Sequence, residues 1–118
     1  MPKAILMTFT GLNDPARQGE YDKWYDEVHI PEVLGTPGFV SARRFSGSAV
    51  RRPSVVGELP QYLTIYELDT EDLQGAFDAL DARVKTGEIT KPPDGLLKPN
   101  TEHEPGIFEV QFEMGGAA

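Results

Sequence analysis

Apolar residues along this chain recur with two different periods, and the changes of period mark its secondary structure. Four segments are rich in β-forming residues and largely alternate apolar with polar positions: 3–10 (KAILMTFT), 39–47 (FVSARRFSG), 61–68 (QYLTIYEL) and 107–114 (IFEVQFEM). Such alternation predicts strands, because successive side chains of a strand point to opposite faces. Clusters of turn-forming residues, such as the GLNDP that follows the first segment, separate them.

Two further segments follow the helical period. The first is expected to begin near Gln18, and one face carries Tyr21, Trp24, Tyr25 and Val28. Pro31 is predicted to end this helix, because it has no N–H for the carbonyl of Glu27 and disfavours helical dihedrals at Ile30. A short turn resumes through 32–34. The second helix is predicted from about Thr70 to Lys85, ends at Gly87, and buries a stripe of Leu73, Phe77, Leu80 and Val84.

The order of these elements is β-α-β-β-α-β, which predicts an α+β, ferredoxin-like fold: a four-stranded antiparallel sheet with both helices on one face. In the third strand, Leu63 and Ile65 are expected to face the helices, and Tyr62, Thr64 and Tyr66 the other side. A second copy of the sheet would cover that other side, so we expect a two-fold homodimer. Residues 1–114 form one domain in this interpretation, and 115–118 a flexible tail.

Composition and charge exclude several classes of protein. Eleven basic and nineteen acidic residues among 118 give a net charge of −8, which repels nucleic acid and anionic membrane surfaces. No apolar run approaches the roughly 20 residues of a membrane-spanning helix. The chain has no cysteine, so it forms no disulfide and has no thiolate chemistry. We therefore expect a cytoplasmic protein.

The stretch YDKWYDEVHIPEVLGTPGFVSARRF, followed by YLTIYEL in the third strand, resembles the EthD-like branch of the dimeric α+β-barrel superfamily. The resemblance covers about residues 18–68 in sequence and nearly all of the element order. It implies a homodimer whose sheets form a barrel, with a small-molecule pocket between helices and sheet in each subunit. Members of the wider superfamily include cofactor-independent lyases, cyclases, dehydratases and isomerases, together with quinone-forming monooxygenases and haem enzymes.

His29 is the main candidate for chemistry. On a helical wheel it lies beside Tyr25 and Tyr21, at the edge of the apolar face and close to Glu32. An imidazole with an ordinary pKa of about 6.5 both accepts and donates protons at neutral pH, which is the step that cofactor-free lyases and isomerases share. The alternative is that His29 is structural and bonds a carbonyl or a tyrosine. The resemblance favours the catalytic role.

The other candidates surround a planar substrate or enter from a loop. Tyr25 and Tyr66 are the expected catalytic partners of His29, and the expected substrate-binding residues are Phe9, Tyr21, Trp24, Glu32, Tyr62, Arg43 and His103. Phe9 and Trp24 would share an apolar wall, although core packing is the favoured role of Trp24. Arg43 and Arg44 point to opposite faces, so one needs an acidic partner, for which Glu67, Glu109 and Glu113 are candidates. His103 follows a twenty-residue stretch without regular structure and could approach as part of a lid.

The two histidines have no metal-ligand spacing, and no phosphate loop or nucleophile elbow is present, so we expect neither a metal nor another cofactor. The sequence therefore favours a cofactor-independent lyase, isomerase or dehydratase that transfers a proton on an aromatic or cyclic metabolite. Two alternatives stay open. One is a cofactor-free monooxygenase of the same superfamily, and the other is a non-catalytic dimer that binds a small ligand.

Overall fold

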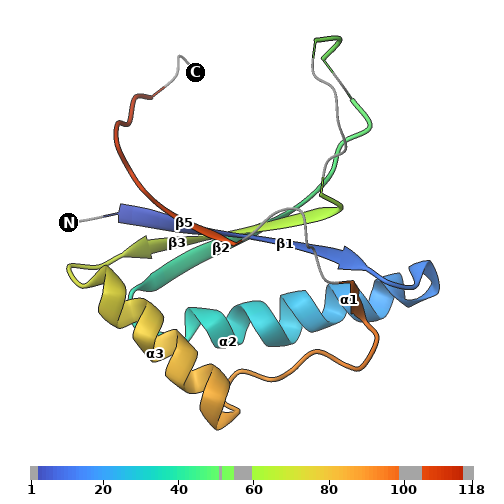
Figure 1. Ribbon diagram of the computed structural model, residues 1–118, viewed down its shortest axis with the longest axis horizontal. Coiled ribbons are helices and arrows are strands. Elements are labelled where there is room, and N and C mark those ends of the chain that lie inside the picture. Colours follow the sequence, from blue (N-terminus) through green and yellow to red (C-terminus); the bar gives the residue numbers. More distant parts are fainter. Residues whose placement is uncertain (1–2, 51, 55–59, 99–104, 116–118) are drawn as a thin grey trace.

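A curved antiparallel sheet with helices on one face forms the frame of the molecule (Figure 1). The computed structural model describes residues 3–50, 52–54, 60–98 and 105–115. The strand order is β2-β3-β1-β5, and β4 pairs with the far end of β1. The bounds are β1 Lys3–Leu12, β2 Phe39–Ser46, β3 Tyr62–Asp69, β4 Leu97–Lys98 and β5 Gly106–Glu109. The predicted ferredoxin-like architecture is confirmed.

The helical layer contains one long composite helix and one regular helix. The composite helix runs through α1 (Gln18–Trp24), the π-helical turn η2 (Tyr25–His29) and α2 (Ile30–Leu34), after a short 3₁₀ turn, η1 (Pro15–Arg17). Helix α3 (Leu73–Thr86) begins at Asp72, whose side chain accepts a hydrogen bond from the N–H of Gly75, and ends at Gly87. Gly87 has a φ of 84°, a left-handed conformation that favours glycine. None of the described helices has the length and apolar character needed to cross a membrane.

Pro31 does not end the first helix, and this prediction was wrong. Ile30 keeps helical dihedrals (φ −60°, ψ −48°), and its N–H bonds the carbonyl of Tyr25, five residues back. The wider π turn immediately before Pro31 changes the hydrogen-bond register at the point where the proline lacks a donor. The helix therefore continues to Leu34.

The two faces of β3 are the reverse of those predicted. Tyr66 and Leu68 are buried against α2 and α3 in the main core, whereas Leu63 and Ile65 lie on the outer face of the sheet. Both faces of this strand are apolar or aromatic, so the alternation alone does not distinguish them. Tyr66 therefore lies between sheet and helices.

Two apolar clusters fill the space between sheet and helices. The first lies under the middle of the sheet and includes Val33, Phe39, Tyr66, Leu68 and Ala76. The second lies under the far end of β1 and includes Leu12, Tyr21, Trp24, Tyr25 and Leu96. Of the predicted stripe on α3, Leu73, Phe77 and Leu80 pack on the first cluster, but Val84 is 48% exposed and Ala76 takes the buried position.

The end of the chain is less regular than predicted in one place and more regular in another. Strand β5 stops at Glu109, the N–H of Val110 still bonds the carbonyl of Lys3, and residues 111–114 leave the sheet (Figure 1). The stretch before it, expected to lack regular structure, contains β4 and the fully buried Leu96. The burial of Leu96 anchors this stretch beside the aromatic residues of α1 and η2.

Candidate functional site

Aromatic rings from the composite helix form a continuous group under the sheet. The Tyr21 and Tyr25 ring centroids lie 5.0 Å apart, and Trp24 meets Tyr25 edge to face at 4.9 Å. Tyr62 of β3 joins the group at 4.7 Å from Tyr21. Tyr21, Trp24 and Tyr25 are all buried, so the cluster is well ordered by its own packing.

The π turn places His29 directly against Trp24. The two rings are stacked, with centroids 4.7 Å apart and an interplanar angle of 16°, and Tyr25 meets the imidazole edge to face at 5.4 Å. Residues five apart do not share a face of a regular α-helix, but a π turn, which bonds i to i+5, brings them together. The helical wheel placed His29 beside Tyr25 correctly and missed its contact with Trp24.

Three buried polar atoms have no hydrogen-bond partner among the described residues: Nε1 of Trp24 and Nδ1 of His29 in this aromatic group, and the hydroxyl of Tyr66 in the first core cluster. A fourth, Oδ1 of Asp69, lies at the end of β3. Leaving such atoms unsatisfied costs about 1–3 kcal/mol each, so native proteins rarely do it without a reason. Two donors and one imidazole nitrogen therefore lack a hydrogen-bond partner among the described residues.

Burial also sets the protonation of these groups. It lowers the pKa of His29 from 6.5, and the nearby carboxylate of Glu32 only partly offsets this effect. Burial raises the pKa values of Tyr21, Tyr25 and Tyr66 above 10.0. At neutral pH the site therefore has a neutral imidazole, which can accept a proton, and neutral phenols, which can donate hydrogen bonds.

Thr10, which the sequence did not single out, and Arg44, for which the sequence predicted only an acidic partner, hold the tyrosines in place. The hydroxyl of Thr10 on β1 lies 2.7 Å from the Tyr21 hydroxyl and accepts a hydrogen bond from the Tyr25 hydroxyl at 3.2 Å. The guanidinium of Arg44 on β2 lies over both rings, 5.7 Å and 5.5 Å from their centroids. These contacts join residues that are far apart in the sequence, so no local motif announces them.

Arg44 has partners other than those predicted. It bonds Asp22 at 3.1 Å and Asp26 at 2.9 Å, both on the composite helix, and not Glu67, Glu109 or Glu113. Acidic residues at positions i and i+4 of a helix share one face, which the sequence spacing of these two could have indicated. Arg43 points to the opposite face as expected, where its guanidinium lies 5.5 Å from the Phe45 ring centroid.

Glu32 lies close to His29, but its carboxylate is hydrogen-bonded to Thr90. Its carboxylate accepts hydrogen bonds from the Thr90 N–H at 3.0 Å and from the Thr90 hydroxyl at 2.9 Å. These bonds lower the pKa of Glu32. In this structure Glu32 anchors the segment after α3 and acts on His29 only through its charge.

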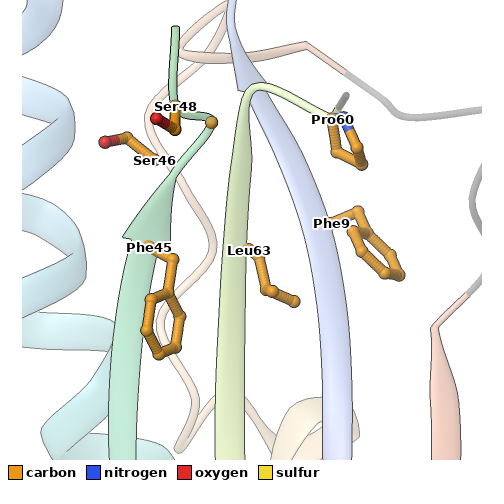
Figure 2. Close-up of a pocket in the computed structure, with 7 residues that line it drawn as sticks. Phe9, Phe45, Ser46, Ser48, Pro60 and Leu63 are labelled. Carbon is orange, nitrogen blue, oxygen red and sulfur yellow. The ribbon is translucent and has the colours of Figure 1, made fainter. Parts of the chain in front are cut away.

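The structure separates the remaining predicted site residues from His29. Phe9 lies on the outer face of β1, on the side of the sheet opposite Trp24, so the two do not form one wall. Figure 2 shows Phe9, Leu63 and Phe45 side by side on three neighbouring strands, lining an apolar cavity of about 290 Å³. Tyr62 lines a second cavity beside Arg44 and donates a hydrogen bond to Gln18 at 2.8 Å. His103 lies outside the described residues.

The described residues contain no group of three or more His, Cys, Asp or Glu side chains that could hold a metal ion. The donors of the aromatic cluster, an imidazole, an indole and phenols, suit an organic molecule with hydrogen-bonding oxygens.

Comparison with known proteins shows likeness in structure. No protein-family model matches the sequence, and no curated protein matches it. An EthD (ethyl tert-butyl ether D) family protein from Bacillus halodurans C-125 is similar in structure, with a TM-score of 0.53 and 19% identity over 94% of this chain and 100% of that one. A protein from Shewanella loihica PV-4 described as a putative monooxygenase has a TM-score of 0.51 and 21% identity, over 96% of this chain and 99% of that one. At these identities the likeness is one of fold.

Proposed function

We propose that this chain, which has the ferredoxin-like fold of the dimeric α+β-barrel superfamily and resembles its EthD-like branch, is a small-molecule enzyme. Its substrate would be an aromatic or cyclic compound bound between the composite helix and the sheet, and the reaction a cofactor-independent proton transfer of the lyase, isomerase or dehydratase type. One observation carries the proposal. Two buried nitrogens of the stacked Trp24 and His29 rings, and the buried hydroxyl of Tyr66 in the neighbouring core cluster, lack partners among the described residues, which supports a polar ligand between the helices and the sheet.

The proposed roles follow from the chemistry of each group. His29, kept neutral by burial, removes a proton from the substrate and returns it at another position or to a leaving group. The hydroxyl of Tyr66 donates to the substrate oxygen on which charge develops. Trp24 and Tyr25 form the wall, and Tyr25 also fixes the edge of the imidazole. The hydroxyl of Tyr25 already donates to Thr10, so we assign it to positioning.

A cofactor-free monooxygenase is the second candidate, favoured by the likeness to the Shewanella protein. In that reaction an electron-rich phenol is deprotonated and gives its electrons to dioxygen. One oxygen atom enters the ring and the other leaves as water. His29 would accept the phenolic proton in this case as well. A third possibility is a non-catalytic dimer in which the aromatic cluster is only core.

Turnover of a panel of hydroxylated aromatic and cyclic carbonyl compounds, with and without oxygen, tests these proposals. The leading proposal predicts turnover that persists without oxygen and falls by about 10²-fold or more in His29→Gln, the usual size of a general-base contribution. Tyr66→Phe, which removes only the hydroxyl, should lower kcat without changing the fold. Turnover that requires oxygen favours the monooxygenase. Unchanged activity in both variants would overturn the assigned roles.

We also propose that two copies associate through the outer face of the sheet, as the resemblance implies. This face carries apolar side chains of four strands: Ile5, Met7, Phe9, Phe45, Leu63, Ile65 and Phe108. Phe45 and Phe108 are 40% and 55% exposed in the single chain. An apolar surface of this extent on one side of a thin molecule favours association, because covering it removes apolar area from water.

A further inference from the structure

A second cavity lies beside the composite helix, on the side of Arg44. It has a volume of about 300 Å³ and is lined by side chains of α1, β2 and β3: Gln18, Asp22, Arg44, Phe45, Ser46 and Tyr62. None of the three unpartnered atoms described above belongs to these residues. It is therefore a site distinct from the one proposed for proton transfer, and its ligand can be tested separately.

The polar atoms of this cavity are fixed in place but only partly used. Oδ1 of Asp22 accepts from Gln18 at 3.1 Å and from Nη2 of Arg44 at 3.1 Å, and the Tyr62 hydroxyl donates to Gln18. Within the described part of the chain, no hydrogen bond involves Oδ2 of Asp22, Nη1 of Arg44 or the Ser46 hydroxyl. The cavity thus has a hydrogen-bonded frame in which one carboxylate oxygen, one guanidinium nitrogen and one hydroxyl have no partner among the described residues.

The charges select a neutral ligand. Arg44 is 18% exposed and is balanced by two carboxylates, Asp22 at 44% and Asp26 at 57% exposure. An anion would meet the carboxylate of Asp22 in the cavity and a surplus of negative charge over the whole chain, and a cation would meet the guanidinium of Arg44. A hydroxyl group suits both, because it donates to a carboxylate and accepts from a guanidinium.

We propose that this cavity binds a neutral six-membered ring with adjacent hydroxyl groups. One hydroxyl would donate to Oδ2 of Asp22, and its neighbour would accept from Nη1 of Arg44. Tyr62, which also lines the cavity, supplies flat apolar surface for the ring.

Catechol is the probe, and chemical shifts of backbone amides in the ¹⁵N-labelled chain are the measurement. We expect saturable shifts centred on residues 18–22 and 44–46. The matched ligands are 1,2-dimethoxybenzene, which lacks both donors, and benzoate, which carries a charge, and both should bind about tenfold or more weakly. Tighter binding of either would overturn the proposal.

Two isosteric variants distinguish the loss of a contact in the cavity from the loss of a charge beside Arg44. Asp22→Asn and Asp26→Asn each remove one charge from the partners of Arg44, but only Asp22 lines the cavity. Asp22→Asn should weaken catechol binding about tenfold or more, and Asp26→Asn much less. Equal effects, or shifts that disappear in His29→Gln and persist in Asp22→Asn, would contradict this site. Thermal unfolding of each variant checks that the fold is kept.

Discussion

At the scale of single residues, a few buried polar groups organise the aromatic cluster. Thr10 is the clearest case, because its one hydroxyl meets the hydroxyls of both Tyr21 and Tyr25. Removing it would leave two buried phenols without that partner, while the rings themselves stay packed. A threonine on the central strand therefore fixes the position of a ring that touches His29.

Thr10→Val keeps the shape of the side chain and removes its hydroxyl. We expect it to lower the free energy of unfolding by about 1–3 kcal/mol, the cost of leaving buried polar groups unsatisfied. Thr10→Ser keeps the hydroxyl and should cost clearly less. Chemical denaturation of the three proteins measures the difference. A valine variant as stable as the serine variant would show that water replaces the hydroxyl.

His29 should make stability depend on pH in a defined window. Burial lowers its pKa from 6.5 in the folded chain, so the unfolded chain takes up this proton first as the pH falls. The free energy of unfolding therefore decreases as the pH drops below about 6.5. Glu20 and Glu32, whose pKa values are lowered from 4.5, add a loss only at more acidic pH.

Denaturation at a series of pH values tests this sign. In His29→Gln the slope just below pH 6.5 should disappear, while the acidic slope from the carboxylates stays. His103→Gln is the matched control, because the chain has only two histidines. A slope that follows His103 instead would contradict the burial argument.

At the scale of elements, the π turn of η2 does most to shape the site. It lets the helix continue past Pro31, and it turns the residues after it so that His29 stacks on Trp24. A sequence pattern read at 3.6 residues per turn cannot show this, because one added residue per turn changes which side chains meet. The helical wheel therefore found the cluster and missed its central contact.

In the other elements, local sequence patterns predict some features and not others. Gly87 acts within one turn of its own position, so the end of α3 could be predicted, while its start lies at Leu73, three residues after the predicted Thr70. The faces of β3 could not be predicted, because apolar and aromatic residues alternate with each other along this strand. Its register against β1 and β2 determines which side chains face the helices. Thr10 and the partners of Arg44 were missed for the same reason, since these contacts join residues of different elements.

Deleting the exposed Glu27 tests the role of the π turn. Loss of one residue from η2 should restore a regular α-helix and leave α1 and α2 on their present faces. Pro31 would then clash with the carbonyl four positions before it, at a cost of about 3 kcal/mol. We expect a folded but less stable protein in which NMR contacts between the Trp24 and His29 rings are lost. Persistence of these contacts would show that the stack does not depend on η2.

At the scale of the whole molecule, the sheet divides two environments. Its inner face packs on helices and holds the proposed chemistry, while its outer face presents phenylalanines and aliphatic residues. Residues 111–114 and residues 47–50 after β2 both rise from the sheet on this outer side (Figure 1). Phe112 and Met114 there are 76% and 79% exposed, so more apolar surface joins the outer face.

Leu63→Glu places a charge at the centre of the outer face. If two copies meet there, the charge would be buried without a partner. The dissociation constant of the dimer should then rise about 100-fold or more. Val84→Glu, on the exposed side of α3, is the control and should leave assembly unchanged. Sedimentation equilibrium of both variants and the parent measures this. A Leu63→Glu protein that still forms a tight dimer would place the interface elsewhere.

Because Trp24 stacks on His29, the intrinsic tryptophan fluorescence of the protein reports on the surroundings of His29. Trp24 is the only tryptophan of the chain, so all indole emission comes from the ring that lies against the proposed base. A protonated imidazole in contact with an indole quenches the indole fluorescence. A ligand that bonds Nε1 of Trp24 would shift the wavelength of the emission maximum. Screening compounds by intrinsic emission would therefore detect occupancy of this one site without any label, and before the reaction is known.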